Sequence, residues 1–293
     1  MQDSKPVVNP YLIVILGVVC TSFASIFTRL ATAPPLVIAF YRLFMTVLLL
    51  TPFLLFSSGI GELKSMSRRD LALASLSGAF LAVHFTVWIT SLRYTSIASS
   101  TVLVTLQPIF VISLGYLFLK EKISTAGGLG GAIALAGSIL IGFGDFRIGG
   151  QALLGDLLAF SGAFFVAVYV LIGRSLRSRL SLLPYVFVVY GTAVLFLLLF
   201  NLLTGTPLYP YPPRDWLWFF ALAVVPTIFG HTVFNWALRY VKAALVSVSI
   251  LGEPVGATLL GILFFREIPG MIQVLGGLAV ISGLTVFLLK ENA

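Results

Sequence analysis

The sequence is poor in charged residues. Only 10% of its 293 residues are Asp, Glu, Lys or Arg and 59% are apolar, whereas a typical soluble domain is roughly 25% charged. A chain of this size cannot hide so much apolar surface from water in one core. Apolar runs of about 20 residues recur along it, the length that crosses ~30 Å of hydrocarbon. The composition excludes a soluble domain and predicts a helical protein that crosses a membrane many times.

Cysteine and histidine are almost absent. The single Cys20 can form neither an intrachain disulfide nor a cysteine zinc site. His84 and His231 have no carboxylate or thiol at metal-binding spacing, so the sequence predicts no metal and no other cofactor. The net charge of +8 comes without a basic stripe of interleaved aromatics, which argues against nucleic acid as a partner. We expect the partners to be a lipid bilayer and a small molecule, and the chain to act as a monomer.

The apolar runs and the basic loops together predict a topology. Twelve of the 18 Lys and Arg residues lie on the side of both termini, five lie on the opposite side, and Arg42 falls within the second run. Cytoplasmic loops carry the excess of Lys and Arg, so both termini are expected in the cytoplasm. Ten spans are predicted, near residues 11–31, 35–57, 71–92, 97–119, 124–143, 152–173, 182–203, 216–238, 243–265 and 270–289.

The two halves of the chain are related by an internal duplication. Residues 92–140 align without a gap on residues 238–286, and 15 of the 49 aligned positions are identical. Each repeat holds five spans, so the repeats at 1–147 and 148–293 must cross the bilayer in opposite directions. Two inverted halves can open one side while closing the other, which predicts alternating access.

Each repeat carries a polar residue and a proline in the middle of its fourth span. Gln107-Pro108 in the first repeat corresponds to Glu253-Pro254 in the second. Proline removes a backbone hydrogen bond, and the freed carbonyls need partners or water inside a membrane. Paired helix breaks in the two halves of a transporter indicate a midplane site and a gating element. The other interpretation is that both prolines only shape helix packing.

Several intramembrane polar residues are candidates for that site. Glu253 is the one acid near the middle of a span. Burying a carboxylate there is energetically unfavourable unless it forms an ion pair, is protonated or contacts water in a cavity. It either binds a proton or an amine, or supports the helix broken at Pro254. His84 shares a helix face with Trp88, as His231 does with Asn235. The histidine and tryptophan rings either face a cavity, or their ring nitrogens form a hydrogen bond with a neighbouring hydroxyl group.

Two further features have structural interpretations. Arg42 is expected to snorkel to the outer surface or to bind a carbonyl. With no intramembrane Lys, the sequence then offers no obvious counter-charge to a multiply anionic substrate. The glycines of the fifth and tenth spans suit close helix packing; they are Gly130, Gly131, Gly137, Gly276, Gly277 and Gly283.

These features resemble the drug/metabolite transporter (DMT) superfamily, EamA type. The likeness lies in the segments 40–44, 106–108, 117–121, 130–137, 253–254 and 265–267, and within the superfamily the chain is most similar to aromatic amino-acid and drug exporters of the YddG kind. The resemblance implies ten spans, a bacterial inner membrane and a central substrate cavity. It implies that the residues lining this cavity include His84, Trp88, Gln107, Tyr169, Asn235 and Glu253.

The sequence therefore predicts an exporter of small neutral or zwitterionic metabolites, with amino acids bearing aromatic and other hydrophobic side chains foremost. Facilitated exchange and proton antiport both remain open. A multidrug or cation exporter of the same superfamily is the nearest alternative. An intramembrane lipid-modifying enzyme would need paired carboxylates or a nucleophile with its base, and the sequence shows neither arrangement. A passive channel would need a charged ring or a filter sequence.

Overall fold

The computed structural model describes residues 6, 8–143, 150–266 and 268–291. Throughout this part of the chain the regular structure is helical, without a strand. The predicted boundary between the two repeats, between residues 147 and 148, lies outside the described residues.

The first half begins with a span made of two helices and continues through four more apolar segments. Its elements are α1 (Pro10–Thr21), α2 (Phe23–Leu30), α3 (Pro35–Leu55), α4 (Gly59–Ser65), α5 (Arg68–Ser91), α6 (Ile97–Val104), α7 (Gln107–Leu114), the π-helical η1 (Gly115–Leu119) and α8 (Thr125–Phe143).

The second half follows the same order. Its elements are α9 (Gly150–Arg177), α10 (Leu182–Leu203), α11 (Pro213–Leu222), the π-helical η2 (Ala223–Thr232), α12 (Val233–Ala237), α13 (Ala243–Ser249), the 3₁₀ turn η3 (Ile250–Gly252), α14 (Glu253–Phe265) and α15 (Met271–Glu291).

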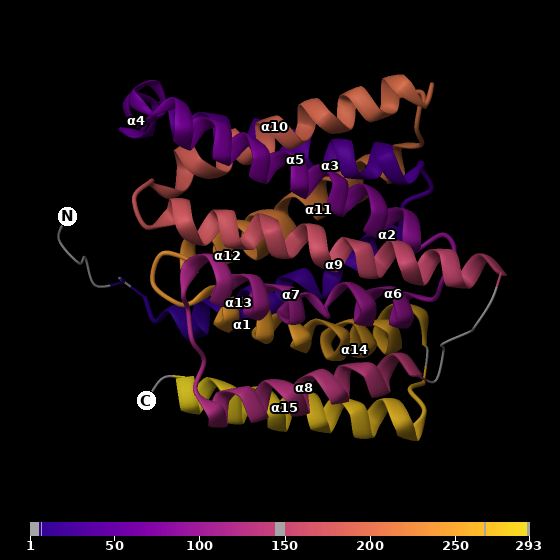
Figure 1. The fold of residues 1–293 in the computed structure, drawn as a ribbon. Coiled ribbons are helices and arrows are strands. Elements are labelled where there is room, and N and C mark those ends of the chain that lie inside the picture. The colour runs from indigo at the N-terminus through magenta and orange to yellow at the C-terminus, as the bar shows by residue number, and fades with distance from the viewer. Residues whose placement is uncertain (1–5, 7, 144–149, 267, 292–293) are drawn as a thin grey trace.

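The helices run back and forth between two ends of one bundle, and the start of α1 lies at the same end as the close of α15 (Figure 1). Nine segments within the described residues are long and apolar enough to cross a membrane, and a further apolar helix, Thr125–Ile141, is shorter. An all-helical membrane fold is thus confirmed, while the fifth predicted span, near residues 124–143, stays a prediction, and with it the total of ten. Below, the termini side is the end of the bundle that carries both termini, and the opposite side is the other end.

Both predicted prolines sit where a helix stops and restarts. The helix α6 ends at Val104 and α7 begins at Gln107, with Pro108 in its first turn. The helix α13 likewise gives way to the 3₁₀ turn η3 before α14 begins at Glu253. Proline lacks the N–H that would continue the ladder but is well accommodated in a first helical turn. Each break therefore creates a new helix N-terminus within the bundle.

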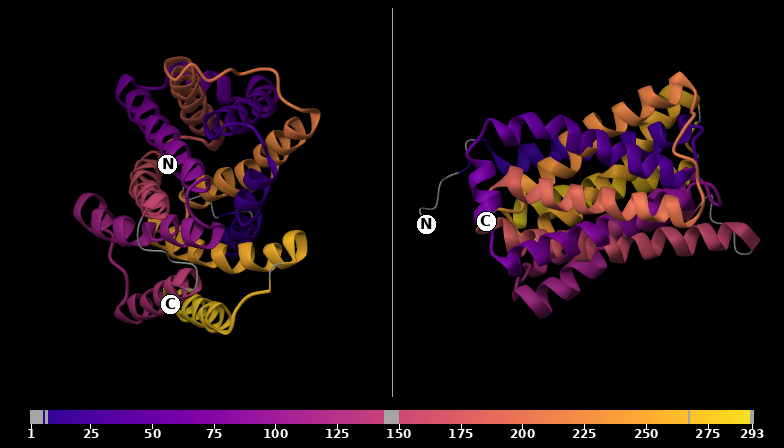
Figure 2. Two further views of the ribbon diagram at one scale, coloured as in Figure 1. Left: turned by 90° about the vertical axis from the view of Figure 1, so that its right-hand side faces the viewer. Right: turned by 90° about the horizontal axis from the view of Figure 1, so that it is seen from above.

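The fifth segment of each half, α8 or α15, packs mainly against the other, set apart from the remaining helices (Figure 2). A Cβ atom added to Gly130 would lie 2.8 Å from the carbonyl oxygen of Gly283, and one added to Gly137 would lie 2.6 Å from that of Gly276. The close packing predicted from the glycines is confirmed at these four positions. A Cβ atom added to Gly131 or Gly277 would instead meet its neighbours at ordinary van der Waals distances.

Candidate functional site

A small cavity lies in the middle of the bundle, between the two halves. Its volume is about 50 Å³, a third of the roughly 150 Å³ apolar cavity that holds a benzene molecule. It must therefore widen to take an organic ligand. All six residues predicted to face a central cavity line it: His84, Trp88, Gln107, Tyr169, Asn235 and Glu253. The walls are completed by residues of both halves, among them Thr21, Arg42, Phe85, His231 and Phe234.

One wall is built from aromatic rings. The His84 and Trp88 rings are nearly parallel, with centroids 6.2 Å apart, because residues four apart share a helix face. The His84 Nδ1–H donates to the Gly162 carbonyl at 2.9 Å, which leaves Nε2 on the free edge of the ring. His231 faces this wall from the second half, with its centroid 6.5 Å from that of His84. Trp88 is buried, and its Nε1–H has no partner.

The opposite wall joins α9 to α12. The Asn235 amide donates to the Tyr169 hydroxyl and, at 2.8 Å, to the carbonyl of His231. These bonds fix the amide so that its Oδ1, buried and without a partner, remains an available acceptor. Gln107 at the start of α7 likewise has a buried Oε1 without a partner. Buried polar atoms are nearly always satisfied, so a group of unpaired ones around a cavity indicates a place for a ligand or water.

The two helix breaks contribute differently. Glu253 lines the cavity as the first residue of α14, where the helix dipole favours a carboxylate. Pro254 does not face this cavity but lines a larger pocket on the opposite side. Pro108 is buried beside Gln107 and lines neither pocket.

The position of Arg42 differs from the one predicted from the sequence. It neither snorkels to the surface nor binds a carbonyl: it is fully buried in α3, lines the central cavity, and its Nε–H donates to the Thr227 hydroxyl at 2.7 Å. Snorkelling is prevented because α3 is covered at this point by η2 and α5. The sequence signal was present, since an arginine inside a span is expected to face the bundle interior.

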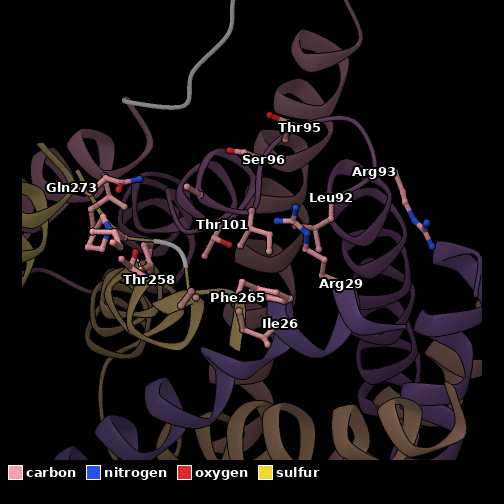
Figure 3. A pocket seen from close by; sticks show the side chains of 18 of the residues that line it. Ile26, Arg29, Leu92, Arg93, Thr95, Ser96, Thr101, Thr258, Phe265 and Gln273 are labelled. Carbon is pink, nitrogen blue, oxygen red and sulfur yellow. Dashed lines mark hydrogen bonds between the residues drawn. The ribbon is translucent and has the colours of Figure 1, made fainter. Parts of the chain in front are cut away.

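A second pocket of about 640 Å³ opens on the opposite side. We call it the outer vestibule; Figure 3 shows the side chains of Arg29, Thr101, Thr258, Phe265 and Gln273 around it. Arg29 lies over the Phe265 ring, with its Cζ 5.6 Å from the centroid. The vestibule reaches down to Pro254, the neighbour of the cavity residue Glu253. Its volume is typical of pockets that take small organic molecules.

The termini side of the cavity is held by a polar cluster that joins the two halves. We call it the termini-side tie. The Glu121 carboxylate accepts a 2.7 Å bond from Arg174 Nε and a 3.0 Å bond from the Ala243 N–H. Arg174 also donates to the carbonyl of Leu238, a residue of the cavity wall, at 2.7 Å. Lys242 donates to the carbonyl of Lys122 at 2.8 Å. In the sequence, Glu121 belongs to the segment 117–121 that carries the family resemblance, but this contact was not predicted.

Comparisons with known proteins agree with this architecture. A sequence model of the EamA-like transporter family matches the chain twice, over residues 9–143 and 153–289. An uncharacterized transporter of Archaeoglobus fulgidus is 26% identical over 275 residues, covering 93% of this chain and 94% of its own. The pseudopaline exporter CntI of Pseudomonas aeruginosa is 25% identical over 251 residues, covering 86% and 85%.

A solved crystal structure shares the fold. It superposes with a TM-score of 0.75 at 17% sequence identity, over 96% of this chain and 98% of its own. The family model covers nearly the whole chain, and the expected resemblance to the EamA type is confirmed. The chain belongs to the EamA-like transporter family and is a membrane transporter.

Proposed function

We propose that this transporter exports small neutral or zwitterionic metabolites, with amino acids bearing aromatic or other hydrophobic side chains as its substrates. It would act by alternating access in a bacterial inner membrane, with both termini in the cytoplasm. The observation that carries the proposal is the central cavity, which both halves line and which brings together aromatic rings, unpartnered amide oxygens and an acid. These groups match the apolar side chain and the ammonium of an amino acid.

The two sides of the cavity support the mechanism. The outer vestibule opens toward the opposite side, while the termini-side tie holds the other end. With the termini in the cytoplasm, this arrangement corresponds to an outward-facing conformation after substrate release. Export then requires the tie to open, the cavity to widen from its present volume and the vestibule to close. Such exchange is expected of two inverted repeats around one site.

Counterflow in proteoliposomes tests this function. Labelled phenylalanine, methionine and threonine are offered to vesicles preloaded with the same unlabelled amino acid, with and without a pH gradient. Saturable counterflow without a gradient would establish a carrier for that substrate, and stimulation by the gradient would indicate proton antiport. No counterflow of any amino acid, in protein shown to be folded, would refute the proposed substrate class.

A matched pair of tryptophans tests the location of the site. Trp88 lines the cavity, whereas Trp236 does not line it and contacts the Tyr240 ring in a tilted arrangement, with ring centroids 4.8 Å apart. Trp88→Leu is expected to raise the half-saturating concentration of phenylalanine about 10-fold or more, by loss of an aromatic contact worth up to ~1.5 kcal/mol and of buried area. Trp236→Leu should leave it near the wild-type value. Equal effects of the two substitutions would contradict this site.

A further inference from the structure

Arg42 lines the central cavity, and its hydrogen bonds leave two of its guanidinium nitrogens unpaired within the described part of the chain. Its Nε–H is taken by the Thr227 hydroxyl, and that hydroxyl donates onward to the Leu222 carbonyl at 2.7 Å. One face of the guanidinium lies on the Phe85 ring, with Cζ 4.2 Å from the centroid. The remaining donors are the Nη1 and Nη2 groups, which are buried and have no hydrogen-bond partner among the described residues. The hydrogen bond at Nε and the contact with the Phe85 ring hold the guanidinium in one orientation. We call its Nη1 and Nη2 groups the fork.

A structural arginine in the same protein looks different. Arg177 is also buried, but its Nε donates to the Asn235 carbonyl at 2.9 Å and its Nη1 to the Leu180 carbonyl. Its hydrogen bonds thus tie backbone segments together. A guanidinium without a hydrogen-bond partner inside a membrane protein is energetically unfavourable. Unpaired guanidinium nitrogens in a residue that lines a cavity therefore indicate a ligand that binds there and dissociates again.

No acid among the described residues forms an ion pair with Arg42. Glu253 lines the same cavity, yet within the described residues it forms no ion pair with Arg42. The cavity therefore carries an arginine and a glutamate side chain that are not in direct contact with each other. A ligand with both charges would pair with each of them. A carboxylate fits the fork, because two parallel N–H···O bonds match its geometry.

We infer that Arg42 binds the substrate carboxylate through Nη1 and Nη2, while Glu253 accepts the substrate ammonium. The unpartnered oxygens of Gln107 and Asn235 supply further acceptors for that ammonium. The inference rests on the proposed export function and narrows it: a substrate must carry a free carboxylate. Arg42 would thereby be the residue that rejects cationic amines and drugs, because a bare cation leaves the fork unpaired and meets its positive charge.

Competition experiments on the wild-type carrier test this directly. Counterflow of labelled phenylalanine is measured against unlabelled phenylalanine, phenylalaninamide and phenethylamine, which differ at the carboxylate. Phenylalanine should compete at least roughly 100-fold better than either amine, because a site built to hydrogen-bond a group strongly rejects analogues without it. Equal competition by phenethylamine would overturn the inference and leave the proposed export function standing. No counterflow of any amino acid would overturn both.

Substitutions of Arg42 test whether this residue discriminates phenylalanine from phenethylamine. Arg42→Gln should bring the ratio of phenylalanine to phenethylamine competition close to one, whereas Arg42→Lys, which keeps the charge but loses the fork, should retain an intermediate ratio. Arg177→Lys is the matched control: it alters a buried arginine whose side chain does not line the cavity and should leave the ratio unchanged. The ratio does not depend on how much protein folds. An unchanged ratio in folded Arg42→Gln would overturn the inference.

Discussion

The termini-side tie makes a quantitative prediction about the balance between the two conformations. In Glu121, two carboxylate oxygens satisfy two donors, Arg174 Nε–H and the Ala243 N–H. The substitution Glu121→Gln keeps the size but leaves a single acceptor oxygen for those donors. Whichever way the amide turns, one donor loses its partner and the other loses its charged acceptor. The tie should therefore open more often.

The size of the free-energy change follows from how far the Arg174 and Glu121 side chains are exposed. A hydrogen bond to a charged group contributes about 1.5–3 kcal/mol when buried. The Arg174 and Glu121 side chains are 25% and 15% exposed, so water compensates part of the loss. We expect a shift of about 1–2 kcal/mol, which corresponds to a 5–30-fold larger population open on the termini side.

Thiol accessibility measures that population. A cysteine placed at Thr105, a buried residue of the cavity wall, reports access in a Cys20→Ser background. A membrane-impermeant thiol reagent applied from the termini side should label it about 5–30-fold faster when Glu121→Gln is added. Glu62→Gln is the matched control, because Glu62 also accepts a backbone N–H, that of Ser181 at 2.7 Å, without joining this tie. Labelling rates that match the parent would refute the reasoning.

Further predictions concern the buried acid and the glycine crossing. If a proton and the substrate ammonium compete for Glu253, Glu253→Gln should abolish the response of transport to a pH gradient in proteoliposomes; an unchanged response in folded protein would exclude that role. Gly137→Val should lower the thermal unfolding temperature by several degrees, because a Cβ there would lie 2.6 Å from backbone atoms of α15. Gly191→Ala, which meets nothing within 4 Å, is its control and should unfold at the wild-type temperature or above.

Much of the fold could be predicted because the membrane imposes strong constraints on the sequence. Span length, the paired prolines and the glycine crossing each follow from backbone hydrogen bonding or close packing, which leave local signals. The short helix α4 lies between two predicted spans and was not predicted, since seven residues are too few for a periodic pattern. The fifth predicted span corresponds to the apolar helix Thr125–Ile141, which is shorter than the nine other spans of the described residues.

The site was predictable in its members but not in its charges. Spacing placed His84 and Trp88 on one face, and the family resemblance added Tyr169. The sequence left two positions open for Arg42, because an arginine within a span can face the bundle interior or snorkel to the surface. The contacts of Arg42 with Thr227 and Phe85 decide for the interior. The partners of Glu121 come from the other half of the chain and are separated from it by 53 and 122 residues. No local pattern encodes such a contact.

The crossing of α8 and α15 has a consequence for how the halves move. Gly130 meets Gly283 and Gly137 meets Gly276, and each residue of one contact is the repeat equivalent of a residue in the other. A local two-fold axis therefore passes between the two contacts. If the repeats exchange conformations, this crossing maps onto itself, so it can serve as a fixed fulcrum while the remaining helices rearrange. A disulfide engineered across it should leave transport intact, whereas one across the termini-side tie should stop it.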